Sequence, residues 1–183
     1  MNKLTVSLLA AFAVAGTSFA GTNYVSSKEY KQTVVAPSCF KDQELSLDVF
    51  YSYNDGINNK QHYFRDRSGG GVGLNFFFAR YFGVDVEGNW FDGAPNKDVI
   101  HQVTGNFIFR YPLETANFCW APYIFGGGGG TFDGVKTGFG DAGAGLEFRF
   151  TPHIGFFSDW RYEFMGSHRN NLDTTRAGLR FVF

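Results

Sequence analysis

From Glu44 to Phe183 the chain alternates hydrophobic and polar residues with a period of two, and clusters of turn-forming residues interrupt the alternation. A period of two is the pattern of a β-strand that has one apolar and one polar face. The interruptions leave eight such segments. The sequence therefore predicts an all-β protein with strands at about 44–54, 69–80, 83–91, 98–111, 119–132, 138–150, 154–165 and 172–183.

The connections between these predicted strands alternate in length. Those near Arg80–Phe82 and Thr151–His153 are short, whereas those at 55–68, 92–97 and 166–171 are longer and more polar. Short turns at one end and longer loops at the other are typical of an up-and-down transmembrane barrel, whose strands need about 9–11 residues each. A soluble sandwich or lipocalin-type barrel shows the same alternation with its apolar face turned inward, so the pattern alone leaves both folds open.

Composition and charge exclude two other classes of protein. Aromatic residues make up 19% of the chain, with 23 Phe, and there are 24 Gly. This combination favours strands and tight turns and excludes a helical bundle. The 16 Lys and Arg residues against 17 Asp and Glu give a net charge of −1, without the basic excess of a nucleic-acid-binding protein. We therefore expect no nucleic-acid partner.

The positions of the aromatic residues favour the membrane barrel over the soluble one. They gather near the ends of the predicted strands, as in the two interfacial girdles of a transmembrane barrel. We expect Tyr51, Tyr53, Trp90, Phe91 and Tyr162 in a girdle at the loop end, and Tyr81, Phe82, Tyr111, Trp120, Tyr123, Phe150 and Phe183 in one at the turn end.

The charged residues on the polar faces are balanced in a way that suits a narrow lumen. Every base among them is Arg, whose planar guanidinium pairs with carboxylates in a bidentate manner, and buried charges need such partners. A solvated outer face with ordinary surface pairs is the alternative. The predicted lumen charge network is Asp48, Asp85, Glu87, Arg110, Asp141, Glu147, Arg149, Asp159, Arg161, Glu163, Arg176 and Arg180.

Glycines lie mainly on the polar faces, where an eight-stranded barrel has little interior space. We expect them to make room for the long Arg and Glu side chains. They are Gly71, Gly73, Gly143, Gly145 and Gly178. Together these features favour an eight-stranded, antiparallel, up-and-down transmembrane β-barrel over 44–183.

The first 43 residues divide into a targeting segment and an arm. Lys3 precedes a nearly continuous apolar run from Leu4 to Ala15, and small residues at Ser18 and Ala20 suit cleavage by a signal peptidase after Ala20. The run is shorter than the roughly 20 residues of a membrane-spanning helix, which is the alternative interpretation. We therefore predict a signal peptide over 1–20 and a short periplasmic N-terminal arm over 21–43.

Two segments carry a resemblance to a known family. The turn and strand over Phe77–Gly88 (FFARYFGVDVEG) and the C-terminal alternation ending in Phe183 resemble the small eight-stranded outer-membrane barrels of the OmpA-like transmembrane-domain type. The resemblance covers about 44–183. It implies a bacterial outer-membrane location, with outer-membrane lipid and the barrel assembly machinery as partners. It also implies that the machinery recognises a C-terminal assembly signal made of Thr175, Ala177, Leu179, Phe181 and Phe183.

Cys39 and Cys119 are the two cysteines of the chain. An even number of cysteines in an exported protein favours a disulfide. In the predicted barrel Cys39 precedes the first strand and Cys119 opens the fifth, which lies roughly opposite in the ring. We therefore hypothesise that the arm around Pro37–Lys41 crosses the barrel mouth as a stapled plug. Two free buried thiols are the alternative.

No motif in the sequence indicates catalysis, a cofactor or a metal. Gly138–Gly143 matches the dinucleotide pattern G-x-G-x-x-G, but period-two alternation follows it where that motif requires a helix. His62, His101, His153 and His168 show no metal-ligand spacing. Ser158 lies on the predicted lipid-facing side without a neighbouring acid, so no Ser-His-acid group is expected. We expect a protein that is not an enzyme.

The sequence favours a structural or interaction role in the outer membrane. A closed lumen would serve membrane integrity, and surface loops would offer contacts for an extracellular ligand, with candidates at Tyr63, Phe64, Arg65, His168 and Arg169. The alternative is a small porin-like channel for ions or small solutes. The discriminating feature is whether Glu87, Glu147, Arg149, Arg161 and Arg180 form one continuous gate. Four apolar residues, Phe50, Phe77, Ile108 and Phe157, are expected to point inward and exclude water.

Overall fold

The computed structural model describes residues 38–56, 67–92, 99–115, 118–132, 136–165 and 171–183. The predicted signal peptide and residues 21–37 of the arm lie outside this part, as do the candidate loop contacts Tyr63, Phe64, Arg65, His168 and Arg169. Among the residues that the structure describes, no helix is long and apolar enough to cross a membrane.

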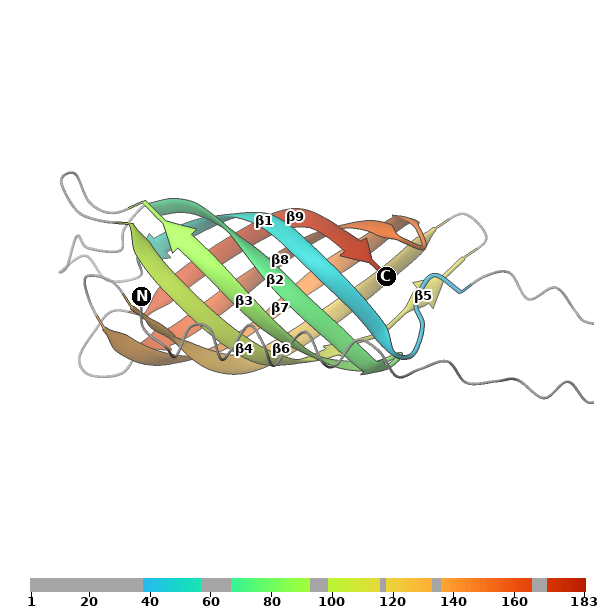
Figure 1. The fold of residues 1–183 in the computed structure, drawn as a ribbon, viewed down its shortest axis with the longest axis horizontal. Coiled ribbons are helices and arrows are strands. Elements are labelled where there is room, and N and C mark those ends of the chain that lie inside the picture. Colours follow the sequence, from blue (N-terminus) through green and yellow to red (C-terminus); the bar gives the residue numbers. More distant parts are fainter. Residues whose placement is uncertain (1–37, 57–66, 93–98, 116–117, 133–135, 166–170) are drawn as a thin grey trace, which may run out of the picture. The chain divides into compact units, whose positions relative to one another are not determined.

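Eight long antiparallel strands close into a ring, which confirms the predicted fold class (Figure 1). Each strand pairs with its neighbours along the chain, β4 pairs with β6, and β9 pairs back with β1. The strands are β1 (Glu44–Gly56), β2 (Arg67–Ala79), β3 (Phe82–Phe91), β4 (Ile100–Arg110), β6 (Cys119–Thr131), β7 (Thr137–Thr151), β8 (Ile154–Met165) and β9 (Leu172–Val182).

A ninth short strand, β5 (Leu113–Glu114), extends the barrel wall beside the start of β6. The eight predicted strands leave residues 112–118 as a connection, so β5 is an element that the alternation did not predict. Two residues are too few to show an alternation, so the pattern could not reveal β5. The strand forms a small hairpin with β6 and brings Glu114 to the rim of the barrel, where it takes part in the site described below.

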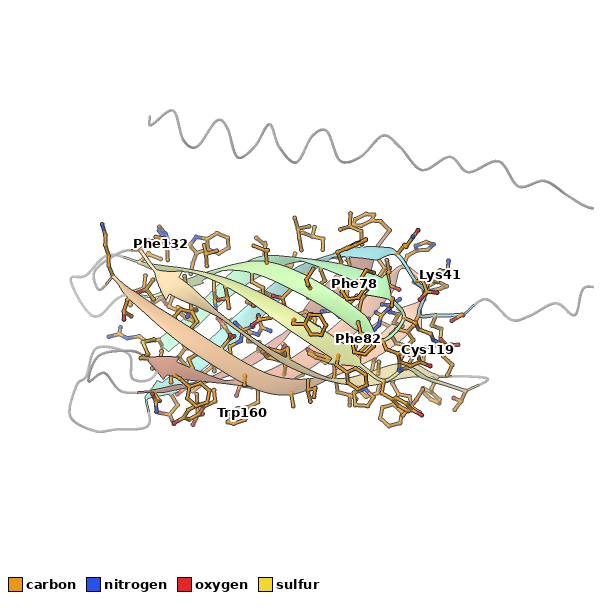
Figure 2. The ribbon with its side chains drawn as sticks, turned by 90° about the horizontal axis from the view of Figure 1, so that it is seen from below. Lys41, Phe78, Phe82, Cys119, Phe132 and Trp160 are labelled. Carbon is orange, nitrogen blue, oxygen red and sulfur yellow. A yellow bond between two sulfur atoms is a disulfide. The ribbon has the colours of Figure 1, made fainter. Side chains whose placement is uncertain are left out.

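The two ends of the barrel differ. At one end the chain makes short turns between β2 and β3 and between β7 and β8, and the β4–β6 connection with β5 lies there too. We call this the turn end. The other four connections lie at the opposite end, the loop end, and each of them includes residues outside the described part. In Figure 2, Lys41 and Cys119 lie at the turn end, whereas Phe132 lies at the loop end.

The strands turn their apolar faces outward and their polar faces inward. On β1, Leu45 and Val49 are each 46% exposed, whereas Ser46 and Asp48 are almost fully buried. Phe78, Phe82 and Trp160, labelled in Figure 2, are likewise exposed. A soluble barrel would have the reverse arrangement, because water would meet the polar face. The exterior of this barrel is therefore suited to hydrocarbon.

Two aromatic residues predicted for the girdles point inward instead. Phe91 is 4% exposed and Tyr123 is 6% exposed. Phe91 has the same parity along β3 as the inward residues Asp85 and Glu87, which places its ring in the lumen. Tyr123 is held inside because its hydroxyl donates a hydrogen bond to the carboxylate of Asp159. Position near a strand end was therefore a weaker guide than parity along the strand.

Glycines on the inward face make room mainly for aromatic rings, which corrects the prediction that they accommodate Arg and Glu. Phe50 pairs across the sheet with Gly71 on one side and with Gly178 on the other, and a Cβ atom at either glycine would overlap the Phe50 side chain. The ring of Phe125 lies in the same way over Gly143. The original expectation holds at Gly73, where the nearest atom is Cγ of Glu87.

Candidate functional site

The lumen brings together the charged residues that the sequence singled out. Every one of the twelve is at most 6% exposed, and all of them lie on the inward faces of the strands. They come from β1 (Asp48), β3 (Asp85 and Glu87), β4 (Arg110), β7 (Asp141, Glu147 and Arg149), β8 (Asp159, Arg161 and Glu163) and β9 (Arg176 and Arg180). They form two separate clusters.

The turn-side cluster consists of three carboxylates and three guanidiniums: Glu44, Asp48, Glu147, Arg110, Arg149 and Arg180. Glu44 Oε1 accepts hydrogen bonds from Arg110 Nη1 at 2.7 Å and from Arg149 Nη2 at 2.5 Å. Arg180 binds Asp48 through Nε and Nη2 at 2.8 and 2.6 Å, and its Nη1 donates to Glu147 at 2.6 Å. Equal numbers of opposite charges with direct hydrogen bonds are what a buried ion network requires.

The loop-side cluster is built around two arginines. Arg176 binds Asp159 through Nε and Nη2, each at 2.7 Å, and donates to Glu87 Oε2 at 2.6 Å. Arg161 donates to the same Glu87 oxygen at 2.6 Å and lies 3.1 Å from Asp141. Glu87 therefore joins both guanidiniums, and its single carboxylate is the centre of this cluster.

Neutral donors support two further carboxylates on this side of the lumen. Asp85 accepts hydrogen bonds from the backbone and side-chain nitrogens of Asn106 at 3.0 and 2.9 Å. Glu163 accepts one from Gln102 Nε2 at 2.8 Å and one from the Thr174 hydroxyl at 3.3 Å. Amide and hydroxyl groups, rather than guanidiniums, thus satisfy the hydrogen-bonding capacity of these two carboxylates.

A layer of aromatic side chains separates the two clusters. Phe50 and Phe157 meet edge to face with their ring centroids 6.2 Å apart. Tyr123 also lies between the clusters, because its ring is 6.0 Å from the Arg180 guanidinium of the turn-side cluster and its hydroxyl donates to Asp159 of the loop-side cluster. On the turn side the Arg180 guanidinium lies 5.2 Å from the Phe157 ring, and on the loop side that of Arg176 lies 4.8 Å from the Phe50 ring. We call Phe50, Tyr123 and Phe157 the aromatic layer.

The five residues proposed as a continuous gate are divided by this layer. Glu147, Arg149 and Arg180 belong to the turn-side cluster, whereas Glu87 and Arg161 belong to the loop-side cluster. The polar link through the layer among the described residues is the hydrogen bond from Tyr123 to Asp159, at 2.8 Å. The ion pairs therefore do not form a single chain of exchangeable partners along the lumen.

Other apolar side chains fill the lumen on both sides of the layer. Phe77 and Ile108, which the sequence placed inward, pack with Tyr123 and Phe125 in one buried cluster. The Phe77 ring also lies 3.6 Å from the Arg110 guanidinium. Near the loop end, a second cluster is formed by Phe139, Met165 and Leu172.

The segment Ser38–Gln43, which we call the mouth segment, lies at the turn end of the lumen. A disulfide joins its Cys39 to Cys119 at the start of β6, with a Cα–Cα distance of 6.2 Å. Phe40 is 1% exposed, and its ring centroid lies 4.2 Å from the Arg149 guanidinium and 5.0 Å from that of Arg110. The two thiols predicted to pair are therefore bonded in the structure, and a phenylalanine lies beside them in the lumen.

Hydrogen bonds fix the backbone of the mouth segment on several sides. The carbonyl of Cys39 accepts from Arg149 Nη1, and that of Lys41 accepts from Arg110 Nη2 at 3.3 Å. On the rim, Glu114 accepts hydrogen bonds from the Ser38 hydroxyl at 2.8 Å and from the Phe40 amide at 3.2 Å. The segment is thus bound both to the lumen arginines and to β5.

Sequence reasoning missed Glu44 and Phe40. Glu44 has the same parity as Ser46 and Asp48, so extending the alternation of the first strand by one step would have placed it in the lumen. Phe40 lies outside the period-two pattern, and no sequence signal marks it. The disulfide hypothesis was the one indication that this segment enters the barrel.

The remaining residues considered for chemistry are scattered. His101 lies on the outer side of β4, and His153 lies in the β7–β8 turn, where its Nδ1 is 3.0 Å from the Val182 carbonyl oxygen. Ser158 donates to the carbonyl of Arg176. Gly138–Gly143 lies within β7, so no helix follows it. Within the described ranges, no group of three or more His, Cys, Asp or Glu side chains could hold a metal ion.

The residues of the predicted assembly signal lie on β9 and at the chain's last position. Thr175, Leu179 and Phe183 are exposed on the outer face, and Ala177 and Phe181 on the same face are half-buried. They form a row that faces away from the lumen, as the alternation predicted. Their role in assembly stays a prediction.

The closed ring, the outward apolar faces and the polar lumen are the fold of the small eight-stranded outer-membrane β-barrels. No protein-family model matches the chain, and no curated protein matches it. The likeness is to solved structures, and it shows the fold. The narrower OmpA-like assignment stays a prediction.

Three solved structures illustrate the likeness. A designed transmembrane β-barrel is 17% identical, with a TM-score of 0.58, covering 78% of this chain and 98% of the design. The N-terminal β-barrel domain of OprF from Pseudomonas aeruginosa is 15% identical, with a TM-score of 0.58, covering 78% and 99%. Ail, the attachment invasion locus protein of Yersinia pestis, is 15% identical, with a TM-score of 0.55, also covering 78% and 99%.

Proposed function

We propose that this chain is a bacterial outer-membrane barrel with a closed lumen, which serves membrane integrity and does not conduct ions. The observation that carries the proposal is the aromatic layer of Phe50, Tyr123 and Phe157 between two buried ion-pair clusters. Ions pass a narrow pore by exchanging water for polar partners along a continuous path. Rings that span the lumen between the clusters interrupt such a path.

The outer-membrane location is supported by the outer face of the barrel and by the closure of its ring. Outward Leu, Val and Phe side chains suit contact with lipid, and a closed ring leaves no unpaired strand edge in hydrocarbon. The outward row from Thr175 on β9 to Phe183 just after it supports recognition by the barrel assembly machinery. Outer-membrane barrels have their short turns in the periplasm and their longer loops outside the cell. The turn end and the mouth segment of this barrel therefore face the periplasm, and the loop end faces the outside.

A test of the closed lumen is ion flux from liposomes that contain the refolded mature protein. The heat-dependent shift in gel mobility that folded barrels show would first confirm folding. We expect an entrapped ion to leave no faster than from empty liposomes. Flux that rises in proportion to the amount of folded protein would contradict the proposal and favour the alternative, a small porin-like channel.

We further propose that the connections at the loop end contact an extracellular ligand. The name of Ail, attachment invasion locus protein, supports adhesion as the form of such a role on this fold. Residues 57–66 and 166–170 belong to these connections. Cells that display the intact chain should adhere to an extracellular matrix, and cells that display a variant with both stretches shortened should adhere less. Equal adhesion by correctly folded samples would contradict this part of the proposal.

A further inference from the structure

We propose that the mouth segment is a redox-controlled stopper. In the oxidised protein the Cys39–Cys119 disulfide holds Ser38–Gln43 in the turn end of the lumen. Reduction by a dithiol releases the segment and opens this end to water. This goes beyond the proposed function, because it concerns the access of water to the turn-side cluster. It holds whether or not ions can pass the aromatic layer.

The first observation is where the two parts of the stopper lie. The Phe40 ring, in the middle of the segment, is buried beside the Arg110 and Arg149 guanidiniums. The two cysteines lie at the rim and are half-buried. The disulfide therefore belongs to residues at the partly exposed rim, whereas the Phe40 ring beside it is out of reach of water.

The second observation concerns the contacts, other than the disulfide, that hold the segment at the rim. The Glu114 carboxylate accepts hydrogen bonds from Ser38 and Phe40. It also forms an ion pair with Arg80 at the exposed rim. Asp42 adds a hydrogen bond from the backbone amide of Arg80. Water competes for such rim contacts, and the conformational entropy of the free segment opposes its ordering. The buried Phe40 ring and the hydrogen bonds to the carbonyls of Cys39 and Lys41 favour the bound segment. The disulfide adds the covalent attachment, and its reduction shifts the balance toward the released segment.

The third observation is that release leaves no buried charge without a partner. Arg110 and Arg149 lose the carbonyls of Lys41 and Cys39, but both keep their ion pairs with Glu44, and Arg149 also keeps Glu147. Water that enters the open mouth replaces the lost carbonyls as acceptor. The released state is thus accessible without disrupting the turn-side cluster.

The chemical step is a thiol–disulfide exchange. A dithiol thiolate attacks one sulfur of the Cys39–Cys119 bond and forms a mixed disulfide, and the second thiol of the reductant then displaces the remaining cysteine. Two electrons and two protons pass to the protein. The products are the two cysteine thiols and the oxidised, cyclic disulfide of the reductant.

Hydrogen–deuterium exchange of the refolded barrel, with and without dithiothreitol, tests the proposal. The Phe40 and Lys41 amides donate to Glu114 and Glu44, so they exchange slowly while the segment is in place. We expect reduction to speed their exchange at least about tenfold, while the amides of β1–β4 and β6–β9 stay protected. Equal exchange in both forms would overturn the proposal. Loss of protection throughout the barrel would also overturn it, because the bond would then stabilise the whole fold.

Two variants separate the contributions of the bond and the ring. The double variant Cys39→Ser/Cys119→Ser should exchange like the reduced protein whether or not dithiothreitol is present. Phe40→Ala keeps the disulfide and should speed exchange of the Lys41 amide in the oxidised form, because the segment loses its buried anchor. Slow exchange of the Phe40 and Lys41 amides in the double variant would contradict control by the disulfide. Unchanged exchange of the Lys41 amide in Phe40→Ala would contradict anchoring by the ring.

Discussion

At the scale of single residues, the lumen depends on carboxylates that each serve two arginines. Glu44 joins Arg110 and Arg149 at the turn side, and Glu87 joins Arg161 and Arg176 at the loop side. Removing one partner of a buried ion pair leaves an uncompensated charge in a region of low polarity, which costs more than the pair itself contributes. Glu147 joins Arg149 and Arg180 in the same way. These three carboxylates are therefore the most sensitive charges among the described residues.

Glu44→Ala should lower the free energy of unfolding by about 3–5 kcal/mol, because it leaves two buried guanidiniums without their shared acceptor. Urea unfolding of the barrel in lipid vesicles measures this change. The control is Asp92→Asn, at an exposed position next to β3, which should stay within about 0.5 kcal/mol of the wild type. A loss below about 1 kcal/mol for Glu44→Ala would show that the pairs with Arg110 and Arg149 are not formed as described.

Glu87 and Asp141 provide a matched comparison within one cluster. Both are buried acids near Arg161. Glu87 accepts short hydrogen bonds from two arginines, whereas Asp141 forms a longer ion pair with Arg161, at 3.1 Å, and neither of its side-chain oxygens has a hydrogen-bond donor in the described part of the chain. Glu87→Gln should destabilise the barrel by about 3 kcal/mol or more, and Asp141→Asn by less than about 1 kcal/mol. Equal effects of the two substitutions in the same urea titration would contradict the assignment of Glu87 as the centre.

At the scale of elements, the strands fit together because glycines on one strand face rings on the next. Phe50 of β1 lies between Gly71 of β2 and Gly178 of β9. An aromatic ring that covers a glycine on a neighbouring strand is a known way of fixing strand register. The same pairs bring the Phe50 ring into contact with Phe157 of β8, so the register of β1 and β9 determines the position of the aromatic layer.

Gly178→Val should destabilise the barrel by about 1–3 kcal/mol, because its side chain would overlap the Phe50 side chain and the backbone of β1. Gly88→Val is the matched control, since Gly88 faces outward on β3 and a Cβ there meets only the Trp90 ring, at 3.7 Å. Valine suits an outward strand position, so this control should be neutral or slightly stabilising. The midpoint of urea unfolding distinguishes the two, and similar midpoints would contradict the packing of Phe50 against Gly178.

At the scale of the whole molecule, the period-two pattern predicted the eight strands, and the positions of the aromatic residues, charges and glycines decided which face of each strand points into the ring. The pattern could not predict which acid meets which arginine, because the Glu87–Arg176 pair depends on register and tilt summed over the strands between β3 and β9. It was silent on Phe40, which lies before the first strand. The expectation that aromatic residues near strand ends face outward failed at Tyr123, whose hydrogen bond to Asp159 forms only in the closed barrel.

The aromatic layer can be tested by removing its two phenylalanines together. Phe50→Ala/Phe157→Ala leaves the ion pairs in place but opens a space between the clusters that water can fill. We expect this variant, once its heat-dependent gel mobility shows that it is folded, to produce small current steps in a planar bilayer. Silence of the folded variant would show that the ion-pair clusters close the lumen without the layer.

Planar-bilayer recording of the refolded mature wild-type protein tests the central claim of a closed lumen most directly. With folded protein inserted, and with the Phe50→Ala/Phe157→Ala variant recorded in parallel, we predict that the wild-type current stays at baseline. Discrete, reproducible steps from the wild type would contradict the account. The two ion-pair clusters on either side of Phe50, Tyr123 and Phe157 would then line a working pore.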